Sequence, residues 1–246
     1  MSTKIVSIPG AVPADTAQAG STLVAPSNFL AQLDADAAAA LVAIATVQHY
    51  GRNDFVFRAG APGRNVYFLR NGKVKIHQLS PLGREVILWF CFPGEIFGLA
   101  EVAGGGGRVV NAQACETSAV LAVAHEKFHD YLDRHPRLAL LSMQVLSSRL
   151  RVLGEMFVNL VSDDVSTRVA KLILRLSARY GTRVGKEVFL NIPLTHQEIA
   201  DMVGTSRQTV TSVLSSLKRQ GVLSIDNRRI HIESEELLNE LTQGNS

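Results

Sequence analysis

Three polar residues near the carboxyl end of the chain, Arg207, Gln208 and Ser212, are of types that hydrogen-bond to the edges of DNA bases. An arginine can bond to both major-groove acceptors of a guanine, a glutamine can pair with an adenine, and a serine donates or accepts. We predict that Arg207 is the main base-reading residue. Residue types that hold backbone phosphates surround these three, and they are Thr195, Gln197, Ser206, Thr209, Arg228 and Arg229.

The segment that must position these side chains, His196 to Ser216, has the spacing of two short helices joined by a tight turn. Ala200 is small at a point where two helices cross closely, and Gly204 follows where the turn needs a positive φ. Apolar residues recur at helical spacing, and they are Ile199, Val203, Val210 and Val213. The pattern predicts a helix-turn-helix; the alternative is an ordinary helical hairpin in a core.

Two capping boxes are expected to start these helices. Thr195 with Glu198 has the right spacing for the first helix, and Thr205 with Gln208 has it for the second. Capping would compete with phosphate binding for the hydroxyl of Thr195. It would likewise compete with base reading for the amide of Gln208.

The charge distribution agrees with a nucleic-acid partner. Residues 165–232 contain eleven basic and four acidic residues, an excess of seven positive charges, whereas the whole chain has a formal net charge of +3. Such an excess attracts phosphates. Arg228 and Arg229 are expected on a β-hairpin wing beside the DNA backbone, and the acidic tail from Glu233 to Glu240 is expected to point away from it.

Composition limits the classes of protein to which the chain can belong. The chain has 246 residues, enough for two domains, and with 46% hydrophobic and 19% charged residues it should be globular. No apolar run reaches the ~20 residues of a membrane helix, and the start does not resemble a signal peptide, so we expect a cytoplasmic protein without a membrane partner. Two cysteines, Cys91 and Cys115, form neither a disulfide framework nor a four-ligand metal site, and no metal is predicted.

Upstream of the basic segment, the sequence predicts a flexible arm over residues 1–22, a short helical region over 28–47, and then many short strands. Asn71-Gly72 has the composition of a type I′ hairpin turn, and Pro81-Leu82-Gly83 is a further turn. Short strands at this spacing favour a compact antiparallel barrel or roll.

A long helix is predicted from Pro136 to Ser162. It carries a heptad seam, which consists of Met143, Leu146, Leu150, Leu153, Phe157 and Leu160. Other faces of this helix are also apolar, so we expect one face to pack on the roll and the seam to form a dimer interface; a monomeric core helix is the alternative. Ser162-Asp163-Asp164 then offers an N-cap and a hinge into the basic domain.

Together these motifs resemble the Crp/Fnr family of bacterial transcription regulators. Residues 63–74, GRNVYFLRNGKV, look like the opening of a cyclic-nucleotide-binding β-roll, and residues 92–98, FPGEIFG, look like the entry to its phosphate-binding cassette. The resemblance covers about residues 28–233. It implies an α+β homodimer with four parts: an arm (1–22), a β-roll effector-type domain (23–135), a dimerisation helix (136–162) and a winged helix-turn-helix domain (163–246) that binds palindromic promoter DNA.

The effector cassette departs from the pattern of family members that bind cyclic AMP. Those members resemble one another in a Glu that holds the ribose, an Arg-Ser pair that holds the phosphate, and a Thr-Ser pair that faces the adenine. Here the corresponding positions are Leu99, Arg108-Val109 and Leu153-Gly154. Because a site built on hydrogen bonds loses affinity when its partners are missing, the sequence argues against cyclic AMP. The candidate effector pocket consists of Gly98, Leu99, Arg108, Val109, Arg149 and Leu153.

Other effectors stay open. Arg108 with Arg149 would suit another anion, such as a cyclic dinucleotide. His77 is the nearest candidate for a haem ligand, because the segment Phe97–Glu101, where the family's carbon-monoxide sensor should carry its histidine, contains none. Residues 1–53 contain no Cys, which excludes the family's N-terminal iron–sulfur cluster. We predict no cofactor and regard an effector-free dimer as a further alternative.

The sequence shows no nucleophile–base pair, metal cluster or nucleotide motif, so we predict that the protein is not an enzyme. The expected partners are double-stranded promoter DNA, a second copy of the chain and RNA polymerase. The alternative function is a cyclic-nucleotide-binding regulatory module that acts by protein contact. Such a module would not need Arg207 or the excess of positive charge.

Overall fold

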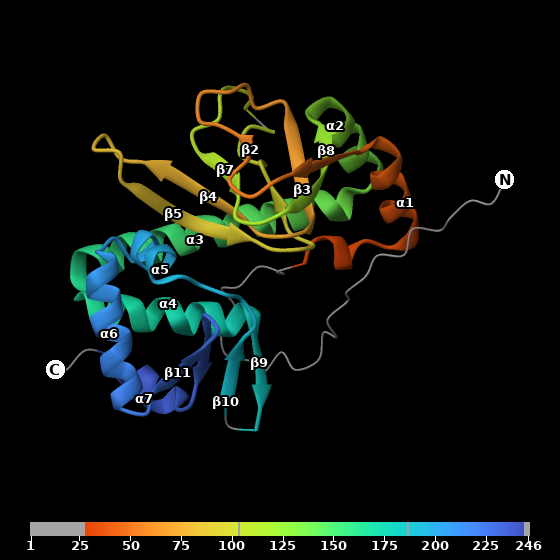
Figure 1. Ribbon diagram of the computed structural model, residues 1–246. Coiled ribbons are helices and arrows are strands. Elements are labelled where there is room, and N and C mark those ends of the chain that lie inside the picture. The colour runs from red at the N-terminus through yellow and green to blue at the C-terminus, as the bar shows by residue number, and fades with distance from the viewer. Residues whose placement is uncertain (1–27, 103, 186, 244–246) are drawn as a thin grey trace.

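The computed structural model describes residues 28–102, 104–185 and 187–243. An antiparallel β-roll lies on one side of a long helix, and a second domain of helices and short strands lies on the other side (Figure 1). The predicted arm, residues 1–22, lies outside the described residues. The α+β class with roll, long helix and helix-turn-helix is confirmed.

The roll consists of two four-stranded sheets in which every neighbouring pair of strands is antiparallel. The first sheet has, in spatial order, β1 (Thr46–Tyr50), β8 (Ser118–Ala124), β3 (Asn65–Asn71) and β6 (Ile96–Phe97). The second has β2 (Phe55–Phe57), β7 (Asn111–Ala114), β4 (Val74–Leu79) and β5 (Glu85–Cys91). The 3-10 helix η1 (Leu30–Gln32) and the helix α1 (Ala35–Ile44) precede them, so the helical region predicted over 28–47 ends before Thr46.

Two apolar clusters hold the roll together. One, which includes Tyr67, Leu69 and Ile76, joins residues of both sheets. The other lies on the first sheet and includes residues of α1, α2 (His125–Arg134) and α3 (Pro136–Ser162). Strand β8 contributes to both clusters, which is why its residues are buried almost without alternation.

The prediction of a hairpin at Asn71-Gly72 is wrong. β3 pairs with β8 and β6, whereas β4 pairs with β5 and β7, so the chain crosses from one sheet to the other at this point. Gly72 has a φ of +90°, but Asn71 is not among the residues with positive φ, and a type I′ turn needs both. The turn at Pro81-Leu82-Gly83, in contrast, does join the paired strands β4 and β5.

Helix α3 has the predicted bounds, Pro136–Ser162. Pro136 occupies the first turn, where a missing N–H costs nothing. Its buried apolar residues, Leu138, Leu141 and Val145, pack in the cluster on the first sheet, so the prediction that one face packs on the roll is confirmed.

Asp164 caps the first helix of the second domain, since its side chain accepts a hydrogen bond from Thr167 N, as the sequence predicts. The elements of this domain are α4 (Val165–Tyr180), β9 (Gly181–Val184), β10 (Glu187–Leu190), α5 (His196–Val203), α6 (Arg207–Arg219), β11 (Leu223–Asp226), β12 (Arg229–Ile232) and α7 (Glu235–Glu240). The strands form one antiparallel sheet in the order β11-β12-β10-β9. Among the helices that the structure describes, none combines the length and the apolarity needed to cross a membrane.

Candidate nucleic-acid interface

Helices α5 and α6 form the predicted helix-turn-helix. Ile199, Ala200 and Val210 are almost fully buried between them, and Gly204 ends α5 in the left-handed conformation with a φ of +72°. That φ is strained for any residue with a side chain, which explains why a glycine stands at the turn.

The two helix starts differ from each other. Thr195 and Glu198 make the complete capping box that the sequence predicts. The second prediction is wrong, because α6 is capped by Ser206, whose Oγ accepts from Thr209 N. The backbone N–H of Thr205, from which Gln208 would accept in a capping box, donates instead to Ala200 O and closes α5. Gln208 therefore has no capping role, and the expected competition for its amide does not arise.

The three candidate base-reading residues lie on the exposed side of α6. Arg207 is the first residue of the helix, Gln208 follows it, and Ser212 lies about one turn further on; all three are exposed. The buried face of the same helix carries Val210, Leu214 and Leu217. The helix thus separates an apolar inner face from a polar outer one, as a recognition helix must.

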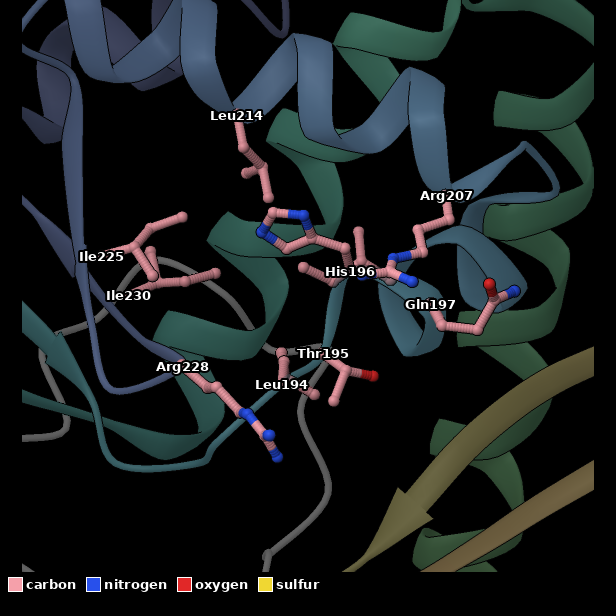
Figure 2. A pocket seen from close by; sticks show the side chains of 10 residues that line it. Leu194, Thr195, His196, Gln197, Arg207, Leu214, Ile225, Arg228 and Ile230 are labelled. Carbon is pink, nitrogen blue, oxygen red and sulfur yellow. The ribbon is translucent and has the colours of Figure 1, made fainter.

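A groove of about 470 Å³ runs between α6 and the β11–β12 hairpin (Figure 2). Arg207 from α6, Arg228 from the hairpin and His196 from α5 line it together with apolar residues. The apolar lining residues are Leu194, Ile199, Leu214, Ile225 and Ile230. Polar side chains from three elements therefore line one groove.

The predicted wing is present. Asn227 and Arg228 form the tip of the β11–β12 hairpin with φ values of +47° and +66°, and Arg229 begins β12. Leu194 N donates to Arg228 O at 3.0 Å, so the tip is bonded to the segment that leads into α5. The wing therefore has a fixed place beside the helix-turn-helix.

The candidate phosphate-binding hydroxyls and amides are already engaged. Thr195 Oγ1 donates to Glu198 Oε2 at 3.0 Å. Gln197 Nε2 donates to Asp201 Oδ1 at 2.8 Å. Ser206 and Thr209 share a hydrogen bond of 2.8 Å between their hydroxyls. These groups are held in place at the starts of the two helices, whereas Arg228 and Arg229 extend from the wing.

One groove residue, His196, was not selected from the sequence. Its Nδ1 lies 2.8 Å from Thr211 Oγ1, which itself donates to Arg207 O at 2.9 Å. Because a hydroxyl has one proton to donate, Thr211 must accept from Nδ1–H of His196, and this leaves Nε2 as the second hydrogen-bonding atom of the ring. The sequence feature that could have identified His196 is its position directly after Thr195, the N-cap of α5.

The candidate effector residues do not form one open site. Arg108 is 3% exposed, and its guanidinium bonds to the Glu101 carboxylate, to Asn65 O, and to Gly98 O at 3.0 Å. Gly98 has a φ of +76°, and a Cβ there would lie 3.1 Å from Arg108 Nη1, so this glycine makes room for the arginine. The cation that would hold a cyclic phosphate is thus already neutralised within the roll.

The other pocket candidates are dispersed. Leu99 is buried in the cluster on the first sheet, and Val109 is exposed. Arg149 pairs with Glu95 at 3.0 Å rather than standing free beside Arg108, and Leu153 is half-buried on α3. These residues do not fit a cyclic nucleotide bound in the way the family pattern implies.

His77 does not fit a haem ligand either. It is 2% exposed, with its Nδ1 3.4 Å from Glu85 Oε2, and burial lowers the pKa of the imidazole. A haem has no access to a ring enclosed in this way. Within the described residues, no cluster of His, Cys, Asp and Glu has the arrangement of a metal site, and burial raises the pKa of the Cys91 thiol to about 12.

The predicted seam of α3 lies on the surface of the single chain. Leu150 and Phe157 are 72% and 69% exposed, and Leu153 is half-buried. The other exposed members are Met143, Leu146 and Leu160. An exposed apolar stripe of this length is typical of an interaction surface.

Comparison with known proteins identifies both domains. Residues 47–135 match the cyclic nucleotide-binding domain, and residues 167–241 match the Crp-like helix-turn-helix domain. The chain is 29% identical over 216 residues to a CRP-like cAMP-activated global transcriptional regulator of Mycobacterium tuberculosis, covering 88% of this chain and 96% of that protein. It is 27% identical over 181 residues to the transcriptional activator protein anr of Pseudomonas aeruginosa, covering 74% of each.

Solved structures show the same fold. A CooA variant from Carboxydothermus hydrogenoformans matches with a TM-score of 0.77 at 24% identity, over 87% of this chain and 95% of that one. FixK2 from Bradyrhizobium japonicum matches with a TM-score of 0.72 at 24% identity, over 82% of this chain and all of that one. With a cyclic nucleotide-binding domain followed by a Crp-like helix-turn-helix domain, the chain belongs to the Crp/Fnr family of transcription regulators.

Proposed function

We propose that the protein is a homodimeric, sequence-specific regulator that binds a palindromic promoter site through α6. The observation that carries this proposal is that Arg207, His196 and Arg228, from three different elements, line one groove beside the exposed face of a capped helix. A helix that presents its first turn in this way can enter the major groove while the wing follows the backbone.

Each candidate residue has a defined task in this proposal. Arg207 pairs with O6 and N7 of a guanine, Gln208 reads an adenine, and Ser212 contributes a weaker contact. Arg228 and Arg229 neutralise phosphates on either side of the wing tip. Thr195, Gln197, Ser206 and Thr209 hold the backbone and fix the register of α6.

The dimer follows from the seam of α3. Burying the exposed side chains of Leu150 and Phe157 removes apolar surface from water, worth ~25 cal/mol per Å². A two-fold axis along α3 would relate two copies of α6, as a palindromic site requires. We place the boundaries of the functional parts at residues 135/136 and 162/163, and we expect the dimer to act on RNA polymerase at promoters.

We further propose that the effector is not cyclic AMP, or that none is needed. The Mycobacterium relative is described as cAMP-activated. In this chain, however, Leu99 replaces the ribose-binding acid, and Arg108 is closed on Glu101. The same two features argue against the alternative function, a cyclic-nucleotide-binding module that acts by protein contact.

Selection from a pool of random duplexes, with and without cyclic AMP, tests the proposal. We expect an enriched palindrome whose selection does not depend on cyclic AMP, and we expect R207A to lose the base preference at one position of each half-site. The contrary result is a protein that enriches no sequence, which would favour the protein-contact alternative. Enrichment only with cyclic AMP would overturn the effector assignment.

A further inference from the structure

The β-roll and the DNA-binding domain of one chain share a buried contact surface. Ile87 and Phe90, on β5 of the roll, belong to the same apolar cluster as the core of the DNA-binding domain, which includes Ile173 and Ile199. Strand β5 lies directly over α5 (Figure 1). The second domain therefore packs on the roll as well as following α3.

Lys73, at the crossing between the two sheets of the roll, reaches into the helix-turn-helix. Its Nζ lies 2.6 Å from Glu198 Oε1, donates to Pro193 O at 3.0 Å and lies 4.2 Å from the centre of the Phe90 ring. Lys73 is only 6% exposed. Its carboxylate partner is the same Glu198 whose Oε2 accepts from Thr195 N and completes the capping box of α5.

Glu95 makes a second polar contact between the domains. Its carboxylate accepts from Arg149 of α3 at 3.0 Å, and from Arg179 and Tyr180 of α4 at 2.9 Å and 3.0 Å. Glu95 is 3% exposed and lies in the turn before β6. One buried carboxylate thus joins the roll, the long helix and the first helix of the DNA-binding domain.

The two contacts have opposite polarity, which makes the docking specific. The roll contributes a buried cation, Lys73, and a buried anion, Glu95, and the DNA-binding domain supplies Glu198 and Arg179 as their counter-ions. If that domain rotated away, Lys73 would lose both of its polar partners and Glu95 would keep only Arg149. A buried charge without a partner is strongly unfavourable, so rotation about Asp163 is opposed at two buried points, in addition to the exposed hydrogen bond from Arg84 to Thr205 O.

We propose that Lys73 and Glu95 are positioning residues for DNA recognition: together they lock the helix-turn-helix to the roll and so fix the separation of the two recognition helices in the dimer. Lys73 acts through Glu198 on α5, and Glu95 acts through Arg179 on α4. The inference rests on the proposed function, because a fixed separation has a consequence only if two copies of α6 read one duplex.

The test measures affinity as a function of the spacing between half-sites. The selected half-site is placed in palindromes whose centre-to-centre spacing varies in single base-pair steps around ~10 base pairs, and alone in a duplex with one half-site. The variants are K73M, which keeps the aliphatic stem, and E95Q, which keeps the shape. E235Q is the matched control, because the Glu235–Arg183 ion pair lies wholly within the DNA-binding domain.

We expect the wild type and E235Q to prefer one spacing strongly. In K73M and E95Q the preference should fall at least fivefold, while affinity for the single half-site stays within twofold of the wild type. If the variants keep the wild-type preference for one spacing, the proposed lock is wrong, but the proposed function is unaffected. A wild type that ignores spacing would contradict the proposed function itself, and the lock with it.

A second measurement does not depend on DNA binding. It therefore applies even if K73M or E95Q also loses affinity for the single half-site. A nitroxide attached at S212C on α6 reports the distance between the two recognition helices in the free dimer. A distance distribution that is narrow in the wild type and broad in K73M and E95Q supports the lock. Equal widths in all three proteins would overturn it, whatever the effect on DNA affinity.

Discussion

Arg207, at the first residue of α6, and Arg228, at the tip of the β11–β12 hairpin, line the same groove. The hydrogen bond from Leu194 N to Arg228 O holds the hairpin tip against the segment that precedes α5. The backbone at Arg228 is therefore held against the helix-turn-helix that carries Arg207, although the two arginines belong to different elements. Because Arg207 lies on the recognition helix and Arg228 on the wing, we expect their replacement to affect DNA binding in different ways.

Replacing Arg207 by Ala should weaken binding to the specific site by about 1–3 kcal/mol and relax the base preference at one position of the half-site. The reason is the loss of a paired contact to a base edge. Binding isotherms on the selected duplex and on a scrambled duplex provide the comparison. Equal losses on the two duplexes would contradict a base-reading role.

Replacing Arg228 by Ala should weaken binding to both duplexes alike, because a phosphate contact carries no sequence information. The slope of log affinity against log salt concentration should fall by about one for each neutralised phosphate. R228K, which keeps the charge, is the matched control and should keep the slope. A loss restricted to the specific duplex would show that Arg228 reads bases.

Charges placed on the exposed seam of α3 should separate the dimer. In L150K and F157K, burial of a lysine against the partner helix is unfavourable, so the sedimenting mass should fall to that of one chain with an unchanged circular dichroism spectrum. V42K is the control, because Val42 is also an exposed apolar residue, 60% exposed, but lies on α1. Dimers that persist in both seam variants would place the interface elsewhere.

Removing the N-cap of α4 should destabilise the DNA-binding domain. Asp164 accepts from Thr167 N at 2.7 Å, and this hydrogen bond lowers the pKa of its carboxyl group. D164A should reduce the free energy of unfolding by about 1 kcal/mol at neutral pH.

The pH dependence of this effect has a definite sign. A carboxyl group whose pKa is lower in the folded than in the unfolded chain stabilises the fold above its unfolded pKa, and the contribution is lost as the pH falls through the folded-state value. The difference between wild type and D164A should therefore shrink on acidification, as measured by denaturant unfolding at a series of pH values. D130A is the control for removal of a carboxylate, because Asp130 is exposed, lies within α2 and caps no helix.

Features encoded by local spacing were predictable from the sequence. The bounds of α3, the capping box at Thr195 and the cap at Asp164 all depend on residues within one or two helical turns. The cap of α6 lies at Ser206, one residue later than predicted, because Thr205 still belongs to the turn that closes α5, where its N–H donates to Ala200 O. Two adjacent hydroxyl residues leave the choice of cap open when only spacing is considered.

Contacts between distant segments were not predictable. Asn71-Gly72 has the composition of a hairpin turn, but the partner of β3 is β8, far along the chain. Lys73 bonds to Pro193, 120 residues away, and Glu95 bonds to Arg179, 84 residues away. Nothing in the local sequence of Arg108 shows that Glu101 closes on it, so the effector pocket was the least predictable part of the molecule.

The central claim is that two copies of the chain join along α3 and present two recognition helices to one duplex. Sedimentation equilibrium of the protein mixed with its selected palindrome tests this most directly. The account predicts a complex of two chains per duplex, which converts to one chain per duplex in F157K. One wild-type chain per duplex, bound equally to any sequence, would contradict it.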